Sequence, residues 1–231
     1  MGKRILSALG FSALVMSGQV MAQTTDWKGC YAGVSASIVE TDNQWTTAVF
    51  RDTVRNENAG SDRADDTAAG IQFGCDFYQS DHWVVGAKLT ANDNTVNASH
   101  LYQGGIGPDN FISYESEDMV SAIIRLGFKA SDNGLIYGNL GYTTSKHVYR
   151  DNSTIPVEFA FSKRDTQTGV LVGVGYEHML KNNFSLFAEY NYTDLGENRV
   201  SLDDLIAPPT NYLADVEQDI AQFSIGVNYR F

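Results

Sequence analysis

The last nine residues of the chain form a pattern that few folds can accommodate. Large apolar side chains occupy every second position, with small or polar side chains between them. The apolar positions are Phe223, Ile225, Val227, Tyr229 and Phe231. This period-two alternation predicts a strand with one apolar and one polar face. As the last strand of a water-soluble sheet it would expose an apolar edge to water, so we expect a strand that faces lipid.

Seven further segments alternate in the same way, which gives eight candidate strands. They are 27–38, 67–78, 83–91, 117–129, 135–146, 166–178, 184–193 and 217–231. About 9 to 11 residues suffice for a tilted barrel strand to cross a bilayer. Connections 79–82, 130–134 and 179–183 are short, whereas 39–66, 92–116, 147–165 and 194–216 are long. This alternation predicts an all-β, eight-stranded antiparallel up-and-down transmembrane β-barrel with short periplasmic turns and four long extracellular loops.

Three internal runs support the same strand assignment. They are Arg-Leu-Gly-Phe (125–128), Gly-Val-Gly-Tyr-Glu (173–177) and Phe-Ala-Glu-Tyr-Asn-Tyr-Thr-Asp-Leu-Gly (187–196). Together with the terminal phenylalanine, they resemble small bacterial outer-membrane barrels of the OmpA-like and opacity-porin kind, in their alphaproteobacterial form. The resemblance implies a Gram-negative outer-membrane location. It also implies that the alternate apolar residues from Phe223 to Phe231 are the signal read by the barrel-assembly machinery.

The N-terminal 22 residues have the features of an export signal. Lys3 and Arg4 precede an apolar run at 5–16, and Val20-Met21-Ala22 supplies a suitable cleavage site. We expect cleavage after Ala22, which leaves 23–231 as one barrel domain. Loss of the two bases changes the formal net charge from -12 to -14, since -12 minus 2 is -14. So acidic a chain excludes nucleic acid as a natural partner, because phosphate binding needs a basic face.

The two faces of the candidate strands differ in composition. One face is rich in Val, Ile, Leu and aromatic residues and is assigned to lipid, while the other is rich in Gly and polar residues and is assigned to the lumen. Aromatic residues near the strand ends suit interfacial girdles; the alternative is the ordinary preference of strands for aromatic residues. The candidate girdle residues are Trp27, Tyr31, Tyr78, Trp83, Tyr142, Tyr176, Tyr190, Tyr192 and Tyr229.

Charged residues on the face assigned to the lumen are the main candidate site. They are Asp76, Lys88, Arg125, Glu177, Glu189 and Arg230. An eight-stranded barrel leaves room only for side chains inside, so these charges must pair or be hydrated. We favour a paired plug that fixes the core, with a switchable ion gate as the alternative. OmpA-like barrels carry a comparable cluster, but Ser35 and Asn139 stand here where that pattern places charges.

Two cysteines occur in the chain, Cys30 and Cys75, near the periplasmic ends of the first two strands. Because these strands are expected to be antiparallel neighbours in an exported protein, a cross-strand disulfide is one interpretation. Two small apolar side chains left as thiols are the other.

No established catalytic, cofactor or metal motif occurs in the sequence. A few eight-stranded barrels modify lipid A, so Ser145 and His147, two apart on one strand face, form a remote candidate pair, with Glu158 as a possible acid. Ser and His at this spacing are common by chance, and we predict no enzymatic activity.

The favoured function is structural and interfacial: envelope support and presentation of loops to a host or surface ligand. A small-solute or ion channel is the alternative. Outer-membrane lipid and lipopolysaccharide are the expected neighbours. Three of the four long connections are acidic, whereas 147–165 carries three acids and three bases. Solvation is the simplest role for these charges, and divalent-cation bridging to lipopolysaccharide phosphates is the alternative.

Overall fold

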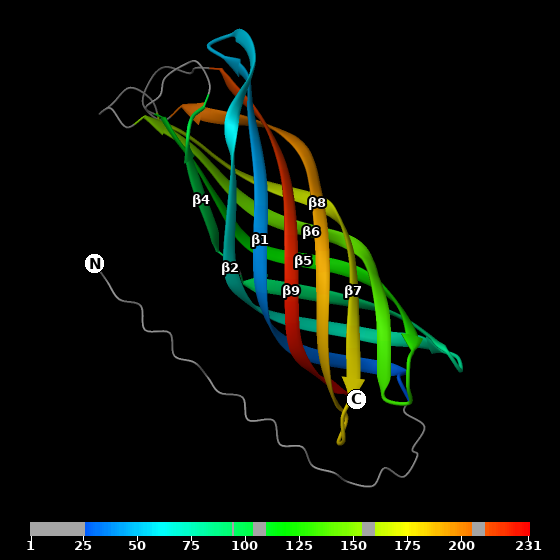
Figure 1. The fold of residues 1–231 in the computed structure, drawn as a ribbon. Helices are drawn as coiled ribbons and strands as arrows, with labels where there is room; N and C mark the ends of the chain where they lie inside the picture. The colour runs from blue at the N-terminus through cyan, green and yellow to red at the C-terminus, as the bar shows by residue number, and fades with distance from the viewer. Residues whose placement is uncertain (1–25, 94, 104–109, 154–159, 205–210) are drawn as a thin grey trace, which may run out of the picture.

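The structure, a computed structural model, describes residues 26–93, 95–103, 110–153, 160–204 and 211–231. The described residues form one ring of antiparallel strands (Figure 1). The strands are β1 (Gly29–Phe50), β2 (Thr53–Gln79), β3 (Trp83–Asp93), β4 (Val96–Leu101), β5 (Asn110–Lys129), β6 (Gly134–Ser153), β7 (Ala160–Met179), β8 (Phe184–Asp204) and β9 (Tyr212–Arg230). Among these residues, no helix is both long and apolar enough to cross a membrane.

The nine strands occupy eight positions around the ring, which confirms the predicted strand count. The sheet order is β3-β2-β1-β9-β8-β7-β6-β5-β4, and pairing of β3 with β5 closes the ring. Trp83 on β3 pairs with Phe128 on β5, and Val96 on β4 pairs with Ser116 on the same strand. β3 and β4 therefore occupy one position in the ring, one after the other, beside β5. Tight turns join the strands at the periplasmic end. Asn182 and Asn183 have positive φ angles in the turn between β7 and β8, where asparagine is well tolerated.

A belt of apolar side chains surrounds the half of the barrel that includes the periplasmic turns. Val34, Ile71 and Val174 are each at least 60% exposed on its outer surface. The intervening residues are buried and polar or small, as Ser121 and Asn139 illustrate. Polar-in and apolar-out is the arrangement that a lipid-embedded barrel requires, so the predicted sidedness of the spanning segments is confirmed.

The long extracellular connections were wrongly bounded, because the strands continue well above this belt. The predicted loop 39–66 is instead a hairpin, in which β1 continues to Phe50 and β2 begins at Thr53. Arg51 and Asp52 between them both have positive φ angles, as a two-residue turn matched to strand twist requires. β6 and β8 likewise continue to Ser153 and Asp204, inside segments predicted to be loops.

Above the belt, the polarity of the wall reverses. Along β1, the outward positions change from Val34 and Ile38 to Glu40 and Asp42, while Trp45 points inward and is fully buried. The inward side chains here form an aromatic and aliphatic cluster, which we call the extracellular plug. It contains Trp45, Phe50, Ala59, Tyr102, Ile112, Tyr114, Tyr149, Phe161, Val200, Leu202, Tyr212, Ala214 and Val216.

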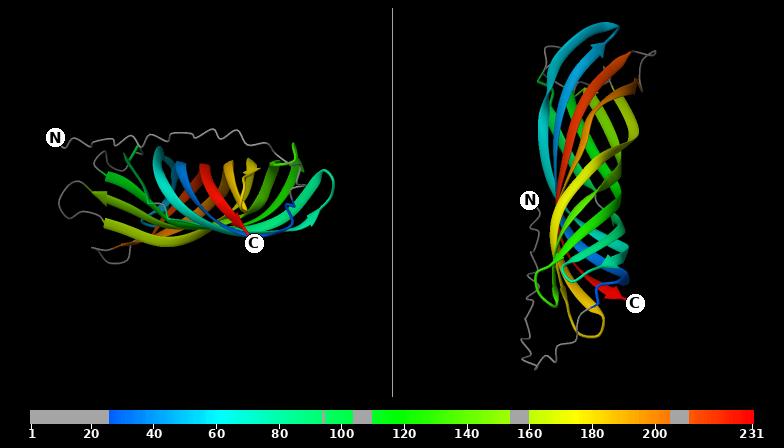
Figure 2. Two further views of the ribbon diagram at one scale, coloured as in Figure 1. Left: turned by 90° about the horizontal axis from the view of Figure 1, so that it is seen from below. Right: turned by 90° about the vertical axis from the view of Figure 1, so that its right-hand side faces the viewer.

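The extracellular half is built as two four-stranded sheets that face each other across this plug. Between β7 and β8 the ladder stops at Val170–Asp194 and resumes only at Ser162–Asp203. No ladder joins β2 to β4 within the described residues. These two interruptions divide the extracellular half of the ring, shown in Figure 2, into β2-β1-β9-β8 and β4-β5-β6-β7. The two sheets stay joined where Ser162 pairs with Asp203 and where Gln103 N donates to the Ala59 carbonyl. An apolar interior between two sheets is the arrangement of a water-soluble β-sandwich.

Candidate functional site in the barrel lumen

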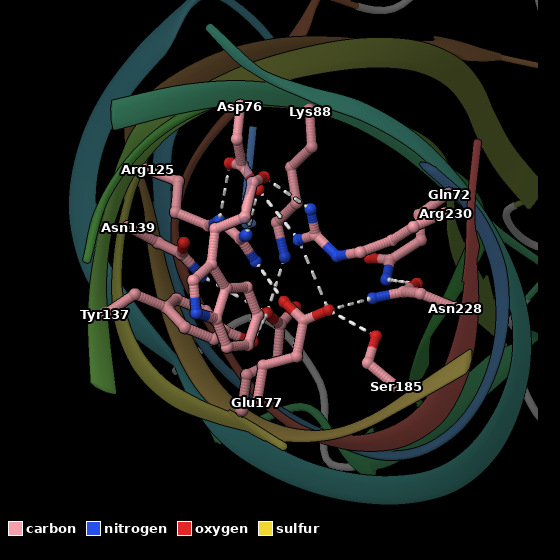
Figure 3. Close-up of polar contacts among 12 residues, drawn as sticks. Gln72, Asp76, Lys88, Arg125, Tyr137, Asn139, Glu177, Ser185, Asn228 and Arg230 are labelled. Atoms are coloured by element: carbon pink, nitrogen blue, oxygen red, sulfur yellow. Dashed lines mark hydrogen bonds and ion pairs between the residues drawn. The ribbon is translucent and has the colours of Figure 1, made fainter. Parts of the chain in front are cut away.

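The lumen inside the belt holds a four-residue ion network. Arg125 on β5 donates from Nη2 to Asp76 Oδ2 at 2.6 Å and from Nη1 to Glu177 Oε2 at 2.5 Å. Arg230 on β9 donates from Nη2 to the same Asp76 Oδ2 at 2.7 Å and lies 3.5 Å from Glu177 Oε1. Figure 3 shows these side chains converging from β2, β5, β7 and β9 on the centre of the lumen.

Neutral groups donate further hydrogen bonds to this network, although the buried Nε of Arg230 has no hydrogen-bond partner. Ser185 Oγ donates to Glu177 Oε1 at 2.5 Å, and Asn228 Nδ2 donates to the same oxygen at 3.0 Å. Gln72 Nε2 in turn donates to Asn228 Oδ1 at 2.5 Å. Satisfied partners of this kind are what make buried charge tolerable, because an unpaired buried charge is costly.

Aromatic rings line the network, and two of them correct the girdle assignment. Trp27 and Tyr31 were predicted at the lipid interface, but they are 0% and 1% exposed and point into the lumen. The Arg230 guanidinium lies 4.9 Å from the Trp27 ring centroid and 4.8 Å from that of Tyr31. A ring face beside a desolvated guanidinium stabilises its positive charge. Tyr31 has the same parity along β1 as Ser35 and Ser37, so the period-two alternation places it in the lumen, and only its position near the strand end suggested the girdle.

The remaining two predicted charges form a second pair. Lys88 Nζ lies 2.5 Å from Glu189 Oε2. Tyr137 OH donates to the same carboxylate at 3.0 Å, and Asn191 Nδ2 donates to Glu189 Oε1 at 3.0 Å. Asn139 donates to this carboxylate at 3.3 Å, so it serves as a neutral hydrogen-bond donor at a position where the family pattern carries a charge.

All six predicted charges thus lie in the lumen, each within salt-bridge distance of an opposite charge. None is more than 7% exposed. The adjoining lumen, bounded by residues such as Thr90, Asn191 and Ser224, contains a cavity of about 10 Å³. That is roughly the space needed by a single water molecule.

Two buried titratable groups lie beside the extracellular plug: Asp151, which the sequence did not single out, next to Tyr212, and His147, stacked on Tyr114. Asp151 is 2% exposed, and its Oδ1 has no hydrogen-bond partner. Burial raises the pKa of Asp151 to about 6, although a hydrogen bond with Tyr212 and the nearby His100 oppose the shift. Burial also lowers the pKa of His147 to about 4. The sequence did not point to Asp151 because residues 147–165 were predicted to form a loop, whereas Asp151 lies within β6.

Ser145 and His147 both point into the lumen, but other partners engage them. Ser145 Oγ donates to the Glu117 carbonyl at 3.1 Å and lies 3.2 Å from Ser116 Oγ. His147 Nδ1 lies 2.5 Å from Tyr114 OH. Glu158, the candidate acid, lies outside the described residues. Within the described residues, no group of three or more histidine, cysteine or acidic side chains is arranged to hold a metal ion.

Cys30 and Cys75 face each other directly on β1 and β2, and their sulfur atoms are bonded in the structure. The bond lies at the periplasmic end of the belt, close to the first turn. It links two strands that already pair along their length.

The last strand, β9, and the terminal Phe231 that follows it expose their alternate apolar residues to the lipid side. Phe223, Ile225, Val227, Tyr229 and Phe231 are 37% to 66% exposed. Its polar residues face inward, including Arg230 of the ion network. β9 also pairs with β1, so the last strand closes the ring against the first.

Comparison with known proteins identifies the family to which this barrel belongs. Residues 10–231 match the model of the outer membrane protein beta-barrel domain. The chain belongs to this family. It therefore resides in the bacterial outer membrane. A 31 kDa outer-membrane immunogenic protein of Brucella melitensis is 26% identical over 215 residues, which is 90% of this chain and 85% of that protein. Outer membrane protein P1 of Coxiella burnetii is 25% identical over 118 residues, covering 50% of this chain and 45% of that protein.

Solved structures share the fold of this family member. The outer membrane protein OprG of Pseudomonas aeruginosa aligns with a TM-score of 0.61 at 18% identity, covering 88% of this chain and 97% of OprG. The outer membrane protease OmpT of Escherichia coli aligns with a TM-score of 0.54 at 12% identity, covering 88% of this chain and 97% of OmpT. At these identities the similarity concerns the fold alone.

Proposed function

We propose that the protein is a filled, non-conducting barrel that supports the outer membrane and presents its extracellular sheets to the outside. The observation that carries this proposal is the double filling of the interior. Paired charges and rings occupy the lumen at membrane level, and the extracellular plug occupies it above. A solute that crossed the barrel would have to displace both.

Surface presentation is supported by the reversed polarity above the belt. The two extracellular sheets expose charged and polar side chains to water and hold their apolar side chains between them. The Brucella relative is named as immunogenic, which fits a protein whose extracellular part is accessible from outside. Contact with a host or surface ligand through the strand tips follows from the same exposure.

Single-channel recording tests the closed lumen. The purified full-length mature chain in planar bilayers is expected to give no stable unitary conductance. The channel alternative draws on the polar lumen and predicts defined steps that change in Lys88→Ala or Arg125→Ala. Such steps would overturn the proposal. The remote enzymatic alternative predicts a mass change in lipid A from cells that overproduce the chain, and we expect none.

Thiol labelling of intact cells tests presentation. Val54, 68% exposed at the β1–β2 hairpin, becomes Val54→Cys, and Lys181 in the turn after β7 becomes the matched Lys181→Cys. A membrane-impermeant maleimide is expected to label Val54→Cys on intact cells and Lys181→Cys only after permeabilisation. The reverse pattern would contradict the orientation. Envelope support is checked separately, by dye leakage in a deletion strain with and without the wild-type gene.

A further inference from the structure

The bond between Cys30 and Cys75 lies on the outer surface of the barrel wall, beside the place where the ring closes. Tyr31 points into the lumen, so the adjacent Cys30 points outward. Cys75 borders an apolar depression of the outer surface together with Phe73. Phe231 donates from its backbone nitrogen to the Cys30 carbonyl at 3.0 Å, and its ring centroid lies 6.4 Å from that of Phe73.

The surroundings of the two sulfur atoms are apolar on the side of the belt. Phe73 and Phe77, which flank Cys75 on the outer face of β2, are 50% and 59% exposed. Both cysteines are half-buried, and the exposed Lys28, two residues before Cys30, is the charge that ends this face of the wall. The sulfur atoms therefore lie in the last row of the apolar belt, on its lipid side.

Thiol chemistry is disfavoured at such a place. A disulfide forms and breaks through attack by a thiolate, and a charged group is costly to bring into an apolar environment. A protein oxidant must also reach the sulfur atoms, and lipid around the wall keeps it away. The periplasm, which an outer-membrane protein crosses before it inserts, is by contrast an oxidising compartment.

The two cysteines enclose a part of the fold that needs no other strand for its pairing. Every residue between them belongs to β1, β2 or their two-residue turn. The pairing of β1 with β9, as in Tyr31 with Arg230, joins opposite ends of the chain instead. An isolated two-stranded hairpin is at best marginally stable in water, so a bond across its strands stabilises it before the ring exists.

The bond also fixes the register at the open end of this hairpin. Two irregularities interrupt the β1–β2 ladder near its turn, between Trp45 and Val49. The turn alone therefore leaves the register of the spanning segments weakly defined, and a slip of one residue would turn every side chain to the wrong face. Because β1 is also the strand on which β9 closes the ring, an error here would prevent closure.

We propose that Cys30 and Cys75 are the substrate of a periplasmic thiol oxidase, a protein with a reactive disulfide, which acts on the chain before membrane insertion. The two thiols lose two protons and two electrons as the bond between the sulfur atoms forms, and the disulfide of the oxidase takes them up and becomes a dithiol. The cross-linked β1–β2 hairpin then enters assembly in the register that β9 requires. This modification is independent of whether the lumen conducts, so its failure would leave the proposed function untouched.

Oxidation of the reduced full-length mature chain by a purified thioredoxin-fold thiol oxidase tests the order of events. One sample is unfolded chain freshly diluted from urea, and the other is folded in lipid nanodiscs, which leave both ends of the barrel in water. Free thiols are counted with maleimide after denaturation. Folding is expected to slow oxidation about a hundredfold or more, because lipid excludes both the thiolate and the oxidase. Equal rates in the two samples would overturn the proposal.

A second cysteine pair on the same hairpin is the matched control. Asp42 and Arg63 face each other on β1 and β2 above the belt, with side chains 49% and 66% exposed. They lie 12 positions along β1 from Cys30 (42 minus 30), an even number, so both pairs are of the same kind in the ladder. Asp42→Cys/Arg63→Cys in a Cys30→Ala/Cys75→Ala background should oxidise at similar rates folded and unfolded. Equal protection of both pairs would refute the argument from lipid. If reduced wild type does not fold, reduction of the oxidised, folded proteins by a charged phosphine gives the same comparison.

Pulse labelling in cells follows the natural order. Acid trapping of thiols reports the bond, and unheated gel mobility reports the folded barrel. The bond is expected in chains that are still unfolded, and barrels that fold in a strain without the oxidase should keep free thiols throughout the chase. Folded barrels whose thiols oxidise later would contradict the proposal. The Cys30→Ala/Cys75→Ala chain should fold several-fold more slowly, and the pair at positions 42 and 63 should restore the rate. Wild-type assembly without either pair would remove the role in register.

Discussion

A buried acid beside the extracellular plug gives the most quantitative prediction. Asp151 has an ordinary pKa of 3.8, and burial raises its pKa to about 6 in the folded protein. A carboxyl whose pKa is raised by folding contributes full stability below its unfolded pKa and loses it as the pH rises through the folded pKa. A pKa that is higher by about 2 in the folded protein destabilises the folded state by about 3 kcal/mol at pH 8. At pH 4 the destabilisation is under about 1 kcal/mol.

Asp151→Asn removes this ionisation while retaining an oxygen that can accept from Tyr212. Any effect of the amide on stability that does not depend on pH cancels when the variant-minus-wild-type difference is compared between two pH values. The difference in unfolding free energy between variant and wild type should therefore shift in favour of the variant by about 2 kcal/mol between pH 4 and pH 8.

Urea unfolding in lipid vesicles measures this difference. Trp45 lies in the plug with its ring 5.4 Å from that of Tyr149, so its fluorescence reports on the relevant region. A background with Trp27→Phe and Trp83→Phe leaves it as the single tryptophan. Asp215→Asn is the control, because its hydrogen bond with Arg199 lowers the pKa of Asp215 and gives the opposite sign. A variant-minus-wild-type difference that stays flat from pH 4 to pH 8 would refute the reasoning.

Three further substitutions test other parts of the interior. Arg125→Ala removes the shared cation of two buried carboxylates and should lower the unfolding free energy by about 3–5 kcal/mol, measured by urea titration. His147→Gln replaces a buried neutral imidazole whose pKa is lowered to about 4. The stability that this neutral group gives the wild type is lost as the pH falls below 6.5. The unfolding free energy of the variant should therefore fall by about 2 kcal/mol less than that of the wild type between pH 8 and pH 5. Cys75→Ser should reduce stability by about 2–4 kcal/mol, and unreduced wild-type protein should take up no maleimide after denaturation.

The membrane-spanning part of this protein was predictable because one period runs through it. Residues such as Val34, Ile124 and Val174 alternate with small or polar ones. Both the number of strands around the ring and the choice of the lipid-facing side follow from that alternation. The alternation also placed the six inner charges on the lumen face, because a period of two leaves each residue only one choice of face.

The extracellular half was less predictable, because its polarity is reversed while its period is unchanged. Glu40 and Asp42 on the outside of β1 look like loop residues when apolar-out is expected. The exact charge partners also depend on register between strands distant in sequence. Arg230, for example, meets Asp76 across 154 residues. Trp27 and Tyr31 were misplaced for a different reason, because their positions near the strand end were given more weight than the alternation, which puts Tyr31 on the lumen face.

The change of polarity along each strand has an evolutionary consequence. Above the lipid belt, outward-facing side chains contact only water, so replacing them leaves the buried plug and the barrel beneath it intact. Any molecule that approaches from outside meets those outward residues and not the inner ones. The fold therefore allows its water-exposed surface to vary in sequence while the framework that carries it stays the same.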